Sequence, residues 1–207
     1  MSSCKLIIVR HGQSEHNRDD IVSGHVDPQL TELGRQQALE TKTKLASYHF
    51  DEVYSSDLQR AIDTASLIFG DIVPKDHQLS DLRERHFGVM EGKPNQHFKN
   101  ILKQNEQLVS SLSESERWRH AHVDGYESNY ELAERFMAAL SKIAEQNPGK
   151  TVLVAAHGGT LRTTLVTVGY ATEAELPGGS IANAAFAELN YHDSQFTYGT
   201  VVGANKR

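Results

Sequence analysis

Two short apolar runs, far apart in the chain, most constrain what it can fold into. Lys5–Val9 and Thr151–Ala156 are continuous and rich in β-branched residues, which is typical of strands buried on both faces of a parallel sheet. A His-Gly pair follows each run, first as His11-Gly12 and again as His157-Gly158. In open α/β sheets ligands bind beyond the carboxyl ends of the strands, so both pairs fall where a ligand is expected.

Between these two runs lie segments in which apolar residues recur at the spacing of an α-helix. One helix is predicted from Leu58 to Phe69, with Ser56 or Asp57 as its cap and Gly70 as its stop. A second carries the apolar positions between Leu132 and Ala144 and ends before Pro148-Gly149, and a third, weaker one runs from about Thr31 to Tyr48.

This alternation of strands and helices predicts an α/β fold. The expected architecture is a single-domain, three-layer sandwich with a mostly parallel central sheet and helices on both faces. Ile181–Leu189 and Gln195–Val202, joined by Asn190–Ser194, are typical of a C-terminal hairpin at the edge of that sheet. Between about Lys93 and His122 the pattern changes to polar helical stretches without a clear apolar face, which indicates an insertion or lid at about 93–125.

Composition limits the class of protein. The 207 residues suit one domain over 1–207, and 21 Lys+Arg against 27 Asp+Glu give a net charge of −6, which argues against nucleic acid as a partner. Cys4 is the only cysteine, so no internal disulfide is possible and the cytoplasm is the default location. The apolar run Leu6–Val9 is too short for a signal peptide or a membrane span, so no membrane association is expected.

The first His-Gly pair has the residue types of an anion site. Arg10 beside His11, followed by a glycine that lets the backbone approach a ligand, suits a tetrahedral anion such as phosphate. An imidazole can also act as a nucleophile, and Asn17 adds a neutral donor. His11 alone could equally be a satisfied histidine at a helix N-terminus, but His157 repeats the construction, and Arg60 would face both rings from the start of its helix.

Five blocks then match a known family in order. Val9–Asn17 resembles the signature of the histidine phosphatase superfamily, the phosphoglycerate-mutase-like proteins. The other blocks that resemble it are Gly24–Thr31 with Gly34 and Gln37-Ala38, Ser55–Ala61 with Thr64-Ala65, Leu82–Gly88 with Glu91-Gly92, and Ala156–Gly159 with Arg162. A lone Arg-His-Gly tripeptide is weak evidence for a family, whereas five matching blocks in the same order are strong evidence.

The resemblance implies a two-step phosphoryl transfer through a phosphohistidine. It implies a nucleophile at His11, phosphoryl donors at Arg10, Arg60 and His157, and an acid at Glu84 that protonates the leaving oxygen. Arginines and a second histidine are also what a phosphoryl group needs as negative charge spreads over its oxygens. Further phosphate-site residues are expected at Asn17, Ser23, Gly24 and Gly158, and contacts from the insertion at Arg119 and His120.

The acid has two candidates. Glu84 is flanked by Arg83 and Arg85, a pattern that ordinarily indicates a solvated ion pair, and the resemblance is what favours it as the acid. To donate a proton near neutral pH its carboxyl must be kept protonated by burial or by the phosphate beside it. Glu15 ranks lower because it lies in the turn after His11, where a carboxylate more naturally caps a helix or orients an arginine.

Eleven histidines raise the alternative of a metal site. His120, His122, His86, His97 and His25 are the candidates, but no cysteine or acidic pattern accompanies them, so neither a metal nor another cofactor is expected.

The substrate is expected to be a small phosphorylated metabolite. From 93 to 122 the chain carries a balance of +2, which is placed to attract anions. Leu82–Gly88 and Trp118-Arg119-His120 resemble the mutase branch of the family, whereas His157-Gly158-Gly159-Thr160 resembles the phosphatase branch. A phosphatase is favoured, a phosphoglycerate-mutase-type phosphotransferase is the alternative, and a non-catalytic phosphate-binding module is a third. The oligomeric state stays open, with a homodimer as one alternative.

Overall fold

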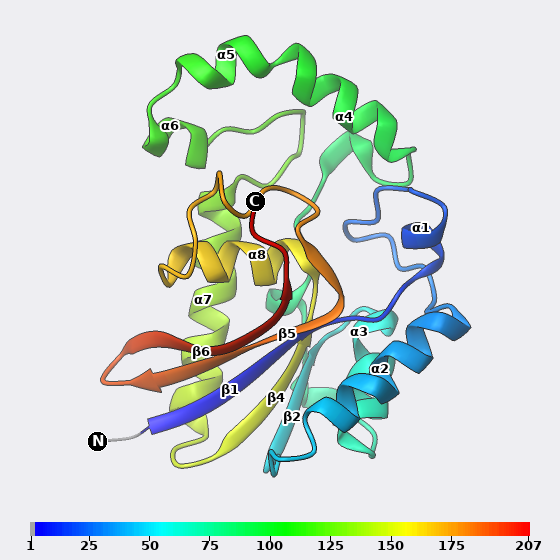
Figure 1. Ribbon diagram of the computed structural model, residues 1–207, viewed down its shortest axis with the longest axis vertical. Helices are drawn as coiled ribbons and strands as arrows, with labels where there is room; N and C mark the ends of the chain where they lie inside the picture. The colour runs from blue at the N-terminus through cyan, green and yellow to red at the C-terminus, as the bar shows by residue number, and fades with distance from the viewer. Residues whose placement is uncertain (1–2) are drawn as a thin grey trace.

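The computed structural model describes residues 3–207 and contains one six-stranded sheet in the order β3-β2-β4-β1-β5-β6 (Figure 1). The first four strands in that order pair in parallel, β5 pairs antiparallel with β1, and β6 pairs antiparallel with β5. The bounds are β1 Ser3–Arg10, β2 Glu52–Ser56, β3 Gln78–Leu79, β4 Thr151–Ala156, β5 Ile181–His192 and β6 Gln195–Ala204. The predicted mostly parallel sheet with a C-terminal hairpin at its edge is confirmed.

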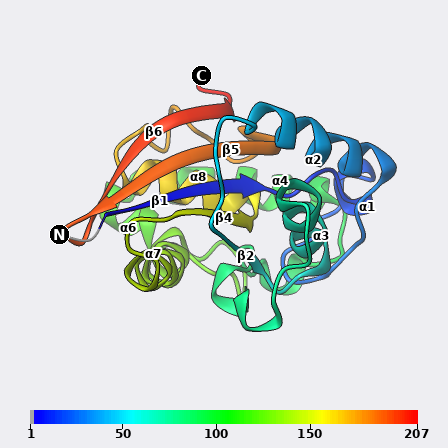
Figure 2. The ribbon, with the colours of Figure 1, turned by 90° about the horizontal axis from the view of Figure 1, so that it is seen from below.

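Helices cover both faces of this sheet. Helices α2 (Glu32–Lys44) and α3 (Gln59–Phe69) pack on one face. Helices α7 (Asn129–Gln146) and α8 (Gly158–Thr167) pack on the other (Figure 2). Alternation along β1 explains the two cores, since successive side chains of a strand point to opposite faces. Ile7 and Val9 join the core with α2 and α3, whereas Leu6 and Ile8 join the core with α7 and α8.

Two local details differ from the sequence expectations. The N-cap of α3 is Leu58, not Ser56 or Asp57: the Ser56 hydroxyl accepts a hydrogen bond from the Leu58 N–H, and Asp57 pairs with Arg83. Gly70 does end the helix, with a left-handed φ of +96°. The β5–β6 connection is shorter than expected, because Asp193 and Ser194 both adopt positive φ and close a two-residue turn.

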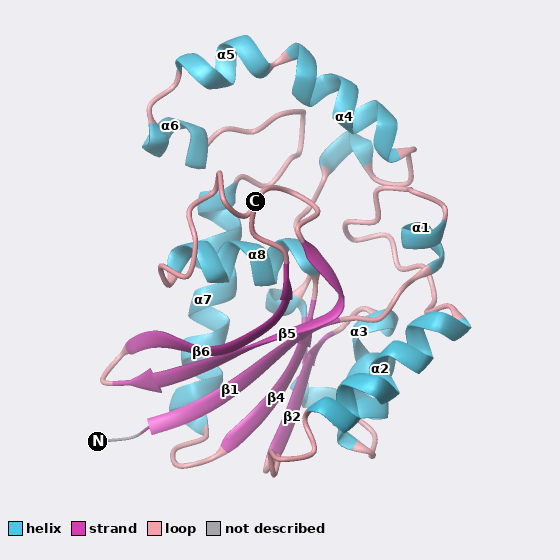
Figure 3. Ribbon diagram, in the orientation of Figure 1, coloured by secondary structure: helices cyan, strands magenta, loops and turns pink. Residues whose placement is uncertain are grey.

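The insertion forms an arch of three helices above the carboxyl end of the sheet, α4 (Asn95–Gln104), α5 (Glu106–Ser111) and α6 (Glu114–Trp118) (Figures 1 and 3). The expectation that it lacks an apolar face is wrong for α4. Phe98 is buried there and Ile101, three residues on, packs against the same cluster. This satellite cluster is separate from the two sheet cores and also contains Val22, Phe87, Met90, Val123 and Tyr126.

The remaining helices are short. They comprise α1 (Glu15–Arg18) and the 3-10 turns Lys75–His77, Ser80–Leu82 and Gly88–Met90. Within residues 3–207, no helix combines the length and apolarity needed to cross a membrane.

Candidate functional site

The sheet brings together the two histidines, His11 and His157, that the sequence analysis placed in one site. Strands β1 and β4 pair in parallel with Arg10 opposite Ala156, so His11 and His157 leave the sheet side by side. Their ring centroids lie 5.2 Å apart at an interplanar angle of 66°. His11 is 4% exposed and His157 is 0% exposed, so both imidazoles are withdrawn from solvent.

A single contact fixes the tautomer of His11. Its Nδ1 lies 2.6 Å from the Gly12 carbonyl oxygen, which can only accept, so Nδ1 carries the proton and donates. In the neutral ring Nε2 then holds the lone pair. Burial, followed by the positive charges of Arg60 and Arg10, lowers the pKa of His11 well below its ordinary value, so the ring is neutral at pH 7.

Two arginines border the histidine pair. Arg60 is 0% exposed, and its guanidinium donates to the Val26 carbonyl at 2.8 Å, the Gly24 carbonyl at 2.8 Å and Asp27 at 3.1 Å. Arg10 is anchored through its Nη1 to the Ile181 carbonyl of β5. The Nε atoms of both are buried without a hydrogen-bond partner.

His157 is the third unsatisfied group. Both of its ring nitrogens are buried and unpartnered, and its pKa is lowered by burial and then by Arg60, so it too is neutral. It is the N-cap of α8, a ten-residue helix whose N-terminus favours negative charge. We call Arg10, His11, Arg60 and His157 the cradle. Its unpaired buried donors need an acceptor, and a phosphate carries one on each oxygen.

Glu84 lies at the same end of α8. Its Oε2 accepts from the Gly159 N–H at 2.9 Å, and its Oε1 accepts from the Arg85 N–H at 2.7 Å. A Cβ on Gly159 would lie 2.3 Å from Glu84 Oε1, so only glycine leaves room for this carboxyl. The negative charge of the Glu84 carboxylate favours the charged form of the guanidinium groups of both Arg10 and Arg60. Glu15, the alternative acid, lies in the first turn of α1.

Asn17 reaches the cradle through a residue that the sequence reasoning missed. Asn183 of β5 donates to Asn17 Oδ1 at 3.0 Å and to the His11 carbonyl at 3.4 Å. Because Asn17 Oδ1 also accepts from the Ser14 N–H, the amide oxygen is fully used and the NH₂ group is the part left for a ligand. The sequence analysis identified this region only as a strand of the C-terminal hairpin.

The other expected phosphate residues border the cradle. Gly158 begins α8, and a Cβ there would lie 3.1 Å from Arg10 Nε, so the glycine lets that arginine pack against the helix end. Gly24 has φ +53°, and a Cβ would lie 2.0 Å from Glu91, a carboxylate that accepts from the His25 N–H. Ser23 precedes it and closes the loop through its carbonyl to the Val26 N–H.

The residues expected to reach in from the insertion lie at its base. Arg119 stacks on the Tyr130 ring of α7 at 3.4 Å, and the His120 ring packs against His122 at 5.0 Å. His120 and His122 lie outside any helix or strand, and the described residues include no group of three or more His, Cys, Asp or Glu side chains arranged to hold a metal.

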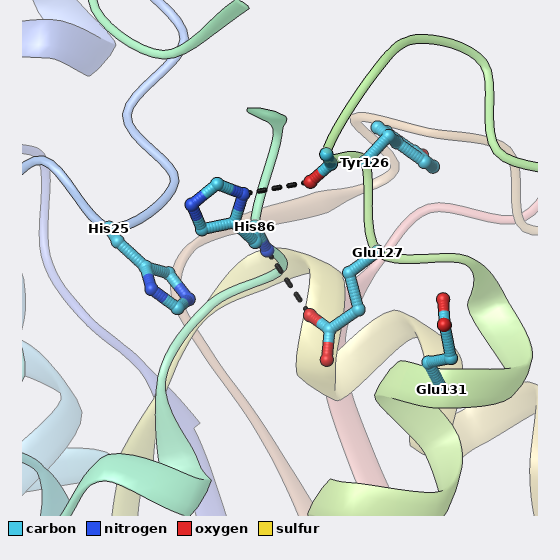
Figure 4. Close-up of a pocket in the computed structure, with 6 residues that line it drawn as sticks. His25, His86, Tyr126, Glu127 and Glu131 are labelled. Atoms are coloured by element: carbon cyan, nitrogen blue, oxygen red, sulfur yellow. Dashed lines mark hydrogen bonds between the residues drawn. The ribbon is translucent and has the colours of Figure 1, made fainter. Parts of the chain in front are cut away.

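A pocket of about 390 Å³ lies against the segment that carries Glu84. Figure 4 shows His25 and His86 on one side of it and Glu127 and Glu131 on the other. His86 donates its backbone N–H to Glu127 at 3.1 Å and its Nδ1 contacts the Gly125 carbonyl at 2.9 Å. His25, which lines the pocket, also connects it to the backbone of Glu84, because its Nε2 donates to the Glu84 carbonyl at 2.9 Å.

Comparison with known proteins gives a consistent result. The pattern of the histidine phosphatase superfamily (branch 1) matches residues 6–202. The chain is 31% identical over 93% of its length to 78% of the metal-independent phosphoserine phosphatase of Arabidopsis thaliana. It is 34% identical over 78% of its length to 68% of a broad-specificity phosphatase of Saccharomyces cerevisiae.

Solved structures agree with this. A phosphoglycerate mutase from Bacillus anthracis matches with a TM-score of 0.82 and 26% identity, covering 97% of this chain and 93% of the other. A mycobacterial glucosyl-3-phosphoglycerate phosphatase matches with a TM-score of 0.77 and 25% identity, covering 98% of this chain and 100% of the other.

Proposed function

The chain belongs to the histidine phosphatase superfamily, and on that premise we propose that it hydrolyses small phosphomonoesters through a phosphohistidine intermediate. The observation that carries the proposal is the state of His11. Its Nδ1 proton is committed to the Gly12 carbonyl, which leaves the Nε2 lone pair as a nucleophile beside buried donors without partners.

The first step forms one bond and breaks one. His11 Nε2 attacks the phosphorus, the bond from phosphorus to the ester oxygen breaks, and Glu84 gives its proton to the departing oxygen. Arg10, Arg60 and His157 donate to the non-bridging oxygens, where negative charge develops. In the second step water attacks the phosphohistidine, the Glu84 carboxylate takes the water proton, and inorganic phosphate leaves with His11 restored.

Support for hydrolysis over transfer comes from the α8 end and from the relatives. Gly159-Thr160 after the second histidine resembles the phosphatase branch, and several relatives are named as phosphatases. The Leu82–Gly88 stretch and Trp118-Arg119 favour a mutase as the second candidate, as do relatives named as phosphoglycerate mutases. In this proposal the insertion acts as a lid that attracts the anionic substrate.

The deciding experiment is a rapid quench with a ³²P-labelled monoester, followed by peptide mapping. Acid-labile, alkali-stable label on the His11 peptide supports the mechanism, whereas label on another residue rejects it. Phosphate binding without turnover would indicate a binding module. Added 2- or 3-phosphoglycerate distinguishes the enzymes, because a mutase gives the isomeric phosphoglycerate and a phosphatase gives inorganic phosphate.

Metal independence is part of the proposal. All the donors of the cradle are side-chain nitrogens, so excess EDTA should leave the rate of monoester hydrolysis within about twofold of the untreated rate. Loss of activity that zinc or magnesium restores would contradict this expectation.

A further inference from the structure

Glu84 lies in a segment whose backbone no regular element holds. Arg83 to His86 follow a 3-10 turn and belong to no helix or strand. A proton donor must stay within a fraction of an ångström of the leaving oxygen, and a displacement of about 1 Å costs about 10²-fold in rate. Something other than a ladder of backbone hydrogen bonds therefore has to fix this segment.

One side chain from α7 does so. Arg135 donates through Nη1 to the carbonyls of Asp81 at 2.8 Å and Arg83 at 3.0 Å, and through Nη2 to the Glu84 carbonyl at 3.4 Å. The guanidinium is planar and rigid, so these contacts fix the carbonyl groups of Asp81, Arg83 and Glu84 relative to α7.

The guanidinium is itself held in place by Glu127. Arg135 Nε and Nη2 donate to the two carboxylate oxygens of Glu127 at 2.9 and 2.8 Å, and the two side chains are only 22% and 15% exposed. A two-point pair of this kind sets the orientation of the fork as well as its position. His25 adds a donor to the Glu84 carbonyl from the opposite loop.

We propose that Arg135 is a positioning residue for Glu84: it fixes the backbone on one side while the Gly159 and Arg85 N–H groups hold the carboxyl on the other. This inference rests on the proposed function of Glu84 as the acid. A purely structural ion pair between Arg135 and Glu127 would affect every substrate alike. A positioning residue affects most strongly the substrates that need the proton.

The test compares two substrates in single-turnover phosphorylation. Arg135→Met keeps much of the side-chain volume and removes all donors, so the rate with an alkyl phosphate should fall by about 10- to 100-fold. With p-nitrophenyl phosphate, whose phenolate leaves without a proton, the fall should stay within about threefold. Arg135→Lys should recover part of the alkyl phosphate rate. Lys142→Met, which removes an exposed cation from the same helix, is the matched control and should change neither rate.

Two further measurements make the outcome decisive. The affinity for inorganic phosphate should be unchanged in Arg135→Met, because the cradle is intact, and thermal unfolding of each variant shows that it is folded. Equal losses with both substrates, or no loss with either, would overturn the inference. If the wild type forms no phosphohistidine, the proposed function fails separately. Hydrogen exchange then tests the positioning itself, since the Gly159 amide should exchange faster in Arg135→Met and an unchanged rate would reject it.

Discussion

The cradle and the insertion are stabilised by different contacts. The cradle lies at the ends of two central strands, and three of its side chains, those of His11, Arg60 and His157, are 4% exposed or less. In the insertion, Phe98 is the one buried residue among the described positions 93–125. Segments with few buried apolar contacts open at lower free energy than a sheet core, so we expect the insertion to open more readily than the cradle.

The largest expected difference between the cradle and the insertion comes from removing one histidine from each region. His11→Ala should lower single-turnover phosphorylation by at least about 10⁴-fold with any monoester, because the nucleophile is required whatever departs. His97→Ala removes an exposed imidazole from α4 and should change the rate by less than about twofold. A comparable loss in both variants would show that the insertion carries chemistry.

The next largest effect concerns Glu84, the proposed acid, whose carboxyl accepts from the N-terminal turn of α8. Glu84→Gln keeps an acceptor for the Gly159 N–H but removes the proton donor. The rate with an alkyl phosphate should fall by about 10²- to 10⁴-fold and with p-nitrophenyl phosphate much less, in single-turnover measurements.

Glu15→Gln is the control for that substitution, since Glu15 lies in α1. Equal losses with the two substrates in Glu84→Gln would reject it as the acid. If Glu15→Gln showed the leaving-group dependence instead, the role would pass to Glu15.

A third substitution tests the insertion directly. Phe98→Ala removes the one buried side chain of α4 and should cost about 3 kcal/mol of local stability. Amide exchange in α4 should then accelerate strongly while exchange in β1 and β4 does not. Leu102→Ala, at a 36% exposed site in the same helix, should have little effect. Equal acceleration in the strands would show that the insertion and the sheet unfold as one unit.

The smallest effect is on acid stability. His157 has its pKa lowered well below the ordinary 6.5, so below pH 6.5 the unfolded chain binds a proton there that the folded chain does not. The contribution of this histidine to stability therefore decreases as the pH falls below 6.5. Urea unfolding between pH 7.5 and 5.5 should show a weaker pH dependence in His157→Asn than in the wild type. His97→Ala serves as the control, and an unchanged slope in His157→Asn would contradict the assignment.

The sequence predicts the parts of this molecule that depend on local pattern. Strands β1 and β4 carry continuous apolar runs, and the helices between them predict that the two strands run parallel. His11 and His157 meet because the two strands are also neighbours, which the local pattern left open. The apolar face of α4 gave only a weak signal, because seven of its ten residues are polar or charged and the third apolar residue, Leu102, lies off that face at 36% exposure.

Residues whose contacts join segments far apart in the chain could not be identified from the local sequence pattern. Asn183 contacts the His11 carbonyl from 172 positions away, and Arg135 reaches Glu84 from 51 positions away. Asparagine in a strand and arginine on a helix are each ordinary, and only the assembled sheet shows what they contact. Leu58 caps α3 for a related reason, since Asp57 is used by Arg83 instead.

The anchoring of Arg10 to the Ile181 carbonyl has a consequence for how the chain becomes active. That contact spans 171 positions, so the cradle closes only when strand β5 has docked beside β1. A chain still being synthesised, in which β5 has not yet paired with β1, contains His11 but not the completed cradle. Contacts of such high sequence separation form late and slowly during folding. The activity proposed for this chain would therefore report on completion of the whole sheet, and its recovery during refolding should lag behind the formation of helices α2 and α3.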